Sequence, residues 1–294
     1  MLVFSLRQAD TLRSRHGRKP TIFPCDLLAC KIADSHHIGL NFMRQLFLVL
    51  CVYLASTCLD SAFAGSPLSV DDLVSKNIAA RGGIDAIHAM QTLRLSGKLL
   101  VNQGQIELAF VQSFKRKGKV RQEASVQGMT QVQAYDGKQG WQIDPFGGRK
   151  DPEKMADDSS KGMAESVNEF DGALTDWQAK GVVVSYLGTE DVEGTLAHKI
   201  KLQRPNADVE YIYLDPDYFL EIRILSQRVE HGVQLAIETN FGDYEKVSGV
   251  FIPFSVDVGK KGSSDRQKIV VEKAELNVAL DDSMFTFPDV ITKK

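Results

Sequence analysis

Apolar residues occupy every second position through much of the chain after residue 91. The ranges 92–101, 106–114 and 120–126 alternate in this way, and Asp136-Gly137 separates two more alternating segments. Such alternation predicts strands with one buried face, and Asp-Gly predicts a tight hairpin turn. This part of the chain is therefore predicted to be an antiparallel meander.

The alternating pattern returns after residue 181 and continues almost to residue 276. Turn residues such as Asp215-Pro216-Asp217 separate the segments, and no internal repeat or flexible linker divides them. The strands predicted here are 182–184, 196–202, 209–214, 218–225, 233–239, 251–258 and 269–276. The expected total for the whole chain is about ten strands.

Besides a short helical turn predicted at Ile84–Met90, two segments have helical character. Ser69 is a predicted N-cap with acidic residues in the next turn, and Gly82-Gly83 ends that helix. Between Pro145 and Asp176 the strand pattern stops, and the segment leans toward helix. The chain thus predicts an α+β, mainly β, domain: a curved antiparallel sheet with an N-terminal helix and a helical insertion held against one face.

A secretory signal peptide is predicted well inside the chain. A short basic segment precedes an apolar run at 46–55, and Ala62-Phe63-Ala64 offers a cleavage site. The run is shorter than the ~20 residues of a membrane-spanning helix. We expect residues 43–64 to be removed after Ala64 and the mature protein to be periplasmic. Residues 1–42 are then an over-extended gene start or a disordered segment, and 65–294 form a single domain.

Removal of the leader changes what the composition implies. All four cysteines lie within it: Cys25, Cys30, Cys51 and Cys58. The mature chain therefore has no disulfide and no thiol nucleophile. The leader carries seven basic and four acidic residues, so its loss lowers the formal net charge from −3 to about −6. A mildly acidic domain of this kind is not expected to bind nucleic acid.

Catalytic signatures are missing from the sequence. The chain has no G-x-S-x-G, no H-E-x-x-H and no glycine-rich phosphate loop, and we expect neither enzymatic activity nor a cofactor nor a metal. His198 alternates with apolar neighbours, so it is interpreted as a core or cavity-lining residue, with a catalytic base as the alternative. The basic range 115–119 is interpreted as a solvated turn, or alternatively as a contact for anionic lipid headgroups.

Several motifs, in order along the chain, resemble one known superfamily. They are Ala79–Ile87 with Leu93–Lys98, the D-G-x-x-x-W hairpin of Ala134–Trp141, Phe170–Leu174, Leu187–Gly194, Gly249–Pro253 and Leu280–Phe285. This series is similar to the outer-membrane lipoprotein-sorting proteins of the LolA/LolB-like superfamily, in a divergent branch. The resemblance implies an incomplete antiparallel β-barrel whose concave face, covered by helices, holds acyl chains.

The resemblance also implies a function. We expect a periplasmic binding protein that carries or senses lipoproteins or lipids through an apolar cavity, in outer-membrane lipoprotein sorting. Its partners would be an acylated ligand, an inner- or outer-membrane transfer partner, and the membrane surface peripherally. An envelope interaction module with a filled core is the alternative, and an envelope hydrolase is a more remote one.

Candidate cavity residues follow from the alternation. A one-residue error in register would exchange the two faces of a strand, so each candidate faces the cavity only if the register of its strand is as predicted. The candidates are Leu95, Leu108, Phe110, Met129, Trp141, Met155, Met163, Phe170, Ile212 and Leu235.

Overall fold

The computed structural model describes residues 68–168, 170–230 and 233–288. The predicted leader segments, 1–42 and 43–64, lie outside these residues. In the residues that the structure describes, no helix is long and apolar enough to cross a membrane.

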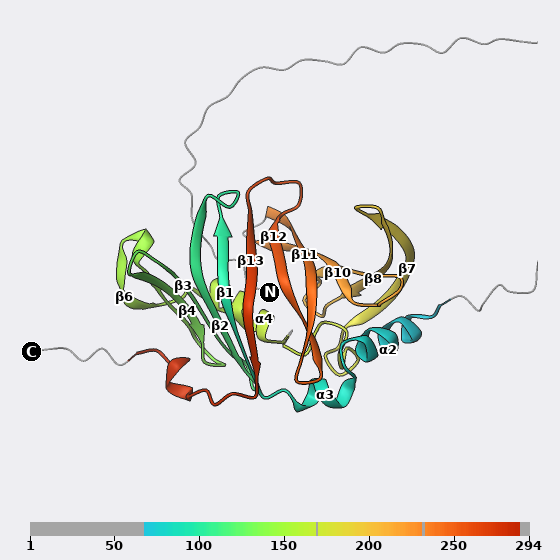
Figure 1. The fold of residues 1–294 in the computed structure, drawn as a ribbon, viewed down its shortest axis with the longest axis horizontal. Helices are drawn as coiled ribbons and strands as arrows, with labels where there is room; N and C mark the ends of the chain where they lie inside the picture. The colour runs from blue at the N-terminus through green and yellow to red at the C-terminus, as the bar shows by residue number, and fades with distance from the viewer. Residues whose placement is uncertain (1–67, 169, 231–232, 289–294) are drawn as a thin grey trace, which may run out of the picture. The chain divides into compact units, whose positions relative to one another are not determined.

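A single antiparallel sheet dominates the described residues. The sheet contains thirteen strands in the order β6-β5-β4-β3-β2-β1-β13-β12-β11-β10-β9-β8-β7, and it is not closed between its edge strands β6 and β7 (Figure 1). The strands are β1 (Thr92–Val101), β2 (Ile106–Lys115), β3 (Lys119–Val126), β4 (Met129–Tyr135), β5 (Gly140–Asp144), β6 (Arg149–Lys154), β7 (Val183–Val192), β8 (Thr195–Gln203), β9 (Val209–Leu214), β10 (Glu221–Glu230), β11 (Val233–Val247), β12 (Val250–Lys260) and β13 (Arg266–Leu276). The predicted α+β, mainly β fold class is confirmed.

The strand count exceeds the expected ten, and β6 is one strand that the pattern did not predict. Its sequence, RKDPEK, has no apolar alternation. Pro152 cannot donate to a ladder, but an edge strand has one side without a partner and tolerates proline there. Position at the edge therefore explains a strand that hydrophobic periodicity could not indicate.

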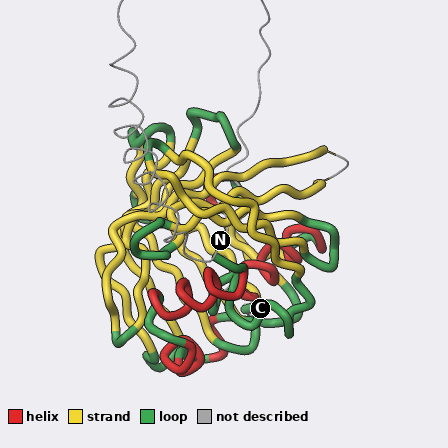
Figure 2. The backbone as a smooth tube through the Cα atoms, turned by 90° about the vertical axis from the view of Figure 1, so that its right-hand side faces the viewer, coloured by secondary structure: helices red, strands yellow, loops and turns green. Residues whose placement is uncertain are grey.

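Three α-helices accompany the sheet in the described residues. They are α2 (Val70–Ala80), α3 (Ile84–Ala89) and α4 (Asp157–Asn168), with short 3-10 turns η1 (Pro145–Gly147) and η2 (Asp282–Met284). Ser69 caps α2 as predicted: its hydroxyl accepts from the Asp72 N–H at 3.1 Å, and the Asp72 carboxylate accepts from the Ser69 N–H at 3.1 Å. Figure 2 shows the helices gathered on one side of the strands.

The face of the sheet that carries the helices is the inner face. Strand register connects its residues across the sheet, for example Leu99 opposite both Ile269 and Leu108, and Phe110 opposite Ala124. These side chains belong to one buried cluster, the central cluster, which consists of Leu99, Val101, Leu108, Phe110, Ala124, Val256, Ile269 and Val271. The predicted alternation therefore places apolar side chains on one continuous face.

Charged side chains form ladders on the opposite, outer face. Arg266 pairs with Asp257 and with Glu238 at 3.2 Å, and Arg223 donates to Asn240 at 2.6 Å. These pairs are half-buried, with the Arg266 and Glu238 side chains 19% and 16% exposed. They make this part of the outer face polar, while elsewhere on the same face apolar residues are buried, for example Trp141 with Val132 and Ala134.

The contact between β1 and β13 joins the two halves of the sheet, and it depends on Gly97. A bulge in the register begins at this residue, and a Cβ there would lie 2.0 Å from the carbonyl oxygen of Val270. Because that oxygen belongs to the neighbouring backbone, a side chain at this position would force the strands apart.

We predict that Gly97→Ala lowers the free energy of unfolding by about 1–3 kcal/mol, the usual cost of overpacking. Thermal unfolding of the purified protein measures the effect. Gly162→Ala is the matched control, because that glycine lies in α4 with open space around it and alanine favours helix by up to about 1 kcal/mol. Equal melting temperatures for the two variants would contradict the prediction.

Candidate functional site

The candidate site is the inner face around the central cluster. Half-buried apolar residues surround the cluster: Leu95, Val126, Phe146, Phe241, Phe254 and Ala274. Three of these are phenylalanines from η1, β11 and β12, so large apolar surface remains partly exposed beside the buried cluster. Such a surface is suited to apolar ligands.

Helix α4 covers one part of the inner face. Its Met163 and Val167 pack with Val120 of β3 and with Met155, forming the α4 cluster. The helix is also fixed to the sheet by Ser160, whose hydroxyl accepts from the Gly140 N–H at 3.2 Å. The predicted helical insertion thus lies over the first half of the sheet.

Helix α2 and the residues 170–181, here called the cover segment, cover the other part. Leu73 and Val74 of α2 and Leu174 of the cover segment are buried with Ile200 and Ile212. This α2 cluster is densely filled. The partly exposed apolar surface therefore lies between two closed ends of the inner face.

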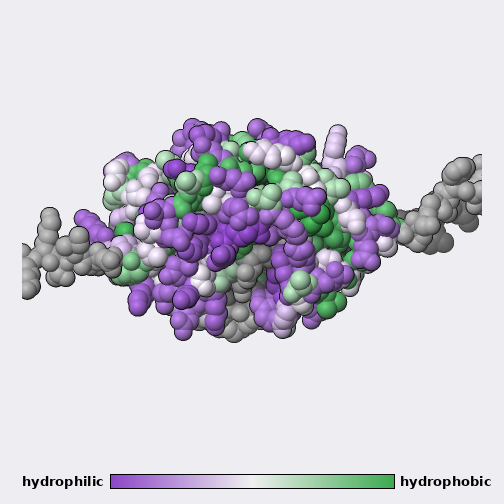
Figure 3. All heavy atoms as spheres, turned by 90° about the horizontal axis from the view of Figure 1, so that it is seen from below, coloured by the Kyte–Doolittle hydropathy of each residue, from purple (hydrophilic) through white to green (hydrophobic). Residues whose placement is uncertain are grey.

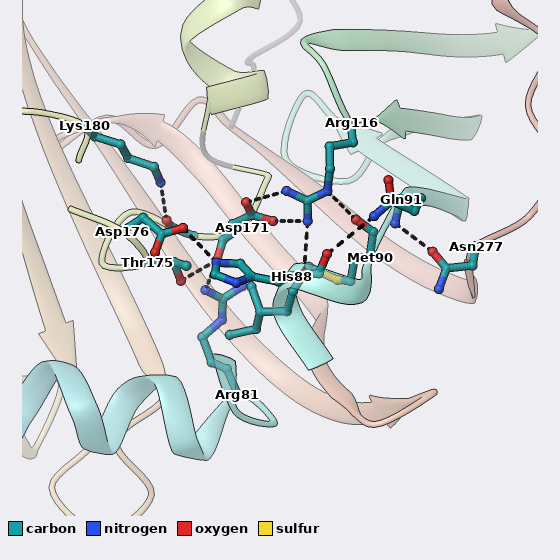
Figure 4. Close-up of polar contacts among 12 residues, drawn as sticks. Arg81, His88, Met90, Gln91, Arg116, Asp171, Thr175, Asp176, Lys180 and Asn277 are labelled. Carbon is teal, nitrogen blue, oxygen red and sulfur yellow. Dashed lines mark hydrogen bonds and ion pairs between the residues drawn. The ribbon is translucent and has the colours of Figure 1, made fainter. Parts of the chain in front are cut away.

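Arg116, in the turn between β2 and β3, holds the cover segment in place (Figure 4). Its guanidinium donates to both carboxylate oxygens of Asp171, at 2.9 and 2.8 Å. It also donates to the carbonyl oxygens of Met90 at 2.7 Å and Ile87 at 3.1 Å. Two-point pairing of this kind is strong and directional, so one arginine joins β2, α3 and the cover segment.

Further polar contacts reinforce this connection, and together with Arg116–Asp171 they form what we call the latch (Figure 4). Arg81 donates to the carbonyl oxygen of Asp171 at 2.7 Å, and Lys180 donates to that of Gly172 at 3.0 Å. His88 lies 2.8 Å from the carboxylate of Asp176. The end of the molecule seen from below in Figure 3 is mostly hydrophilic, with smaller hydrophobic groups between the polar ones.

The basic turn at 115–119 is occupied by internal ion pairs. Lys115 and Lys119 both contact Asp282 of η2, at 2.6 and 3.0 Å, and hydrogen bonds from these two lysines lower the pKa of Asp282. With Arg116 bound to Asp171, three of the basic side chains have acidic partners. The turn therefore connects the cover segment to the C-terminal residues, in addition to its contact with solvent.

An open hollow of about 390 Å³ lies beside the latch. Its lining residues are Arg116, Lys117, Gly118, Val167, Phe170 and Asp171. The lining is largely polar, and the two charged side chains that face each other there are already paired. This hollow is therefore a gap between the latch and α4 rather than an apolar cavity.

The candidate residues other than Trp141 lie on the inner side of the sheet, in several clusters. Leu108 and Phe110 are in the central cluster, Met155 and Met163 in the α4 cluster, and Ile212 in the α2 cluster. Leu95, Phe170 and Leu235 are half-buried, and Met129 is 40% exposed. They do not converge on one cavity.

Trp141 lies on the outer face, contrary to its place among the predicted cavity residues. It is opposite Ala134 in the register and packs with Val132 and Phe287. Its indole N–H donates to the carbonyl oxygen of Phe285 at 2.7 Å. The C-terminal segment covers this part of the outer face, so Trp141 is buried although it does not face the interior. The alternation of apolar residues does not tell on which of the two faces a buried side chain lies.

His198 is a buried residue in an aromatic setting. Its Nδ1 lies 2.9 Å from the Tyr186 hydroxyl, and its ring stacks on Phe219 with the centroids 5.8 Å apart. Burial lowers the pKa of His198, and the charge of Lys76 lowers it further. Its neighbours Tyr186 and Phe219 are aromatic, which agrees with the interpretation as a core or cavity-lining residue.

The described residues contain no group of three or more potential metal ligands from histidine, cysteine, aspartate and glutamate.

Two sets of polar residues were absent from the sequence prediction. One is the latch, which joins residues far apart in the chain. The other is a set of glutamines on β2 to β5, at positions that the alternation assigns to the apolar face. Their signal in the sequence was a polar residue where the pattern calls for an apolar one.

The sequence matches no protein-family model, and the comparison with curated proteins gives no match. Among solved structures it resembles a domain from Vibrio parahaemolyticus described as an outer membrane lipoprotein-sorting protein domain, with TM-score 0.50, 10% identity, and coverage of 73% of this chain and 94% of that chain. A LolA superfamily protein from Nitrosomonas europaea matches with TM-score 0.49, 11% identity, and coverage of 75% and 98%. The likeness shows that this chain shares the fold of the Vibrio domain, in agreement with the resemblance of the sequence motifs.

We predict that Asp171→Asn loosens the cover segment. Loss of hydrogen bonds to a charged group costs about 1.5–3 kcal/mol, so amide hydrogen exchange in residues 170–181 should accelerate about tenfold or more. Asp176→Asn is the control, because its pair with His88 is half exposed and such pairs contribute little. Equal exchange rates in the two variants would contradict this role of Asp171.

We also predict that His198 makes the fold sensitive to acid. Its pKa is lowered in the folded state, so the unfolded state binds the proton more readily. The stability contribution is present above pH ~6.5, the pKa of a free histidine, and is lost as the pH falls toward the folded value. Chemical denaturation at pH 7 and pH 5 measures the free energy of unfolding, which should fall less for His198→Gln than for the wild type. An equal fall in the two proteins would show that His198 is not the source of the acid sensitivity.

Proposed function

We propose that the chain is a periplasmic binding protein that carries or senses lipoproteins or lipids, working as a mature domain of residues 65–294. The observation that supports this most directly is the inner face: half-buried Phe146, Phe241 and Phe254 surround a buried apolar cluster between two covered ends. The lipoprotein-sorting fold agrees with this reading. Proposed partners are an acylated lipoprotein or lipid and a membrane-bound donor or acceptor.

The energetics of acyl chains suit a carrier. Removal of one methylene from water gains about 0.8 kcal/mol, so a chain of ~16 carbons gains on the order of 12 kcal/mol. A bilayer offers nearly the same gain. Transfer between the inner face and a membrane is then close to balanced, and small contributions from the cover segment or a partner set its direction. Such a cycle needs no bond-making chemistry on this chain.

Native mass spectrometry tests the proposal. The full chain is expressed in a bacterial host, recovered from the periplasmic fraction without detergent, and weighed before and after denaturation. We expect an intact mass that begins at Gly65 and a bound lipid or lipopeptide that denaturation releases. A ligand-free mass together with no saturable binding of acylated probes would favour the alternative, an interaction module with a filled core.

We predict that Phe241→Glu reduces lipid binding at least tenfold. A carboxylate on the inner face would have to lose its hydration when an acyl chain covers it, which is costly. Phe287→Glu is the matched control, since this half-buried aromatic packs on the outer face beside Trp141. Binding of a fluorescent fatty-acid probe measures both variants, with circular dichroism to check folding. Similar losses in the two variants would count against the inner face as the binding surface.

A further inference from the structure

Four glutamines form a row across the inner face. Gln112 of β2 is opposite Gln122 of β3, which is opposite Gln133 of β4, which is opposite Gln142 of β5. Gln112, two residues from Phe110 in the strand, shares its inner face. The row is thus a continuous line of side-chain amides, here called the glutamine row, beside the central cluster on the inner face.

Most of the glutamine row is withdrawn from solvent. Gln112, Gln122 and Gln133 are 4%, 1% and 8% exposed, and Gln142 is half-buried. On the same strands, Phe110 and Ala124 of the central cluster flank the row on one side, and Val120 of the α4 cluster flanks it on the other. Helix α4 packs on β3, β4 and β5, so a ligand at the row would lie beneath the edge of this helix.

One fully buried atom of the row has no hydrogen-bond partner. Among the described residues, the buried side-chain oxygens without a hydrogen bond are Oε1 of Gln122 and Oδ1 of Asn77. An amide oxygen only accepts hydrogen bonds, so the group that Gln122 lacks is an N–H or O–H donor. A buried amide oxygen without a donor is unfavourable, which makes its retention in an apolar interior a pointer to a ligand.

We propose that the glutamine row binds the polar group of an acyl ligand, and that Gln122 accepts a hydrogen bond from a donor located next to the acyl chain. The ligand class is therefore an acyl lipid with an amide N–H or a hydroxyl beside its chain, in preference to a plain ester. This inference rests on the proposed function and deepens it: the apolar clusters hold the chain, and the row selects the linkage.

Two probes of equal chain length test the inference in the full secreted protein. N-methylpalmitamide carries an N–H donor, and methyl palmitate carries none. Displacement of a fluorescent fatty acid gives an affinity for each. We expect the wild type to bind the amide about tenfold more tightly than the ester, and Gln122→Met to bind both with equal affinity. Hexadecanol shows whether a hydroxyl serves as the donor as well as an amide does.

The control is Gln131→Met. Gln131 is also buried and lies on β4, but it is outside the row and its Nε2 faces Asp144 at 3.5 Å. This variant should keep the preference for the amide. Equal binding of both probes by the wild type, or a preference that survives in Gln122→Met, overturns the inference while leaving the proposed function standing. Failure to bind any of the probes refutes the proposed function and the inference with it.

The ligand-free protein provides a second measurement. Because Gln122→Met removes a buried oxygen that has no partner, its melting temperature should equal or exceed that of the wild type. A clear decrease would mean that Gln122 already has a partner in the free protein, and that result also overturns the inference. Folding of the variant is verified in the same experiment.

Discussion

The structure depends on one constraint: a large antiparallel sheet whose inner face is apolar across several strands must bury that face with very little helix. The sheet has thirteen strands, while the helices beside it have 11, 6 and 12 residues. The two ends of the inner face are covered densely by α2 and α4, and the middle keeps half-buried aromatic residues. The proposed binding of an apolar guest depends on this partly covered apolar surface.

Short covers must be fixed by polar contacts, because their own buried area is small. Arg116 meets this need by joining Asp171 of the cover segment to carbonyl groups of α3. The same turn holds η2 through Lys115 and Lys119, and η2 leads into the segment that covers Trp141 on the outer face. One turn between β2 and β3 thus contacts the covers of both faces.

Periodicity predicted most strands because burial of one face dictates alternation, and it placed Phe110 and Ile212 on the inner face. It was wrong for Trp141, whose burial comes from a partner 144 residues away. It missed β6, which is stabilised by its neighbour at the edge rather than by apolar side chains. The capping box of α2 could be predicted because Ser69 and Asp72 are three residues apart, whereas the latch and the glutamine row exist only once the register is known.

The glutamine row and the apolar clusters contribute different things to recognition. Apolar burial determines whether an acyl chain leaves water, but it depends on area and scarcely distinguishes one chain from another of equal length. A buried acceptor is directional, and a ligand without a donor leaves it unpaired. A buried amide oxygen without a partner reduces stability in the free state, and a ligand that supplies the missing donor recovers that loss on binding. Selectivity and a cost in the free state are therefore two consequences of the same buried oxygen.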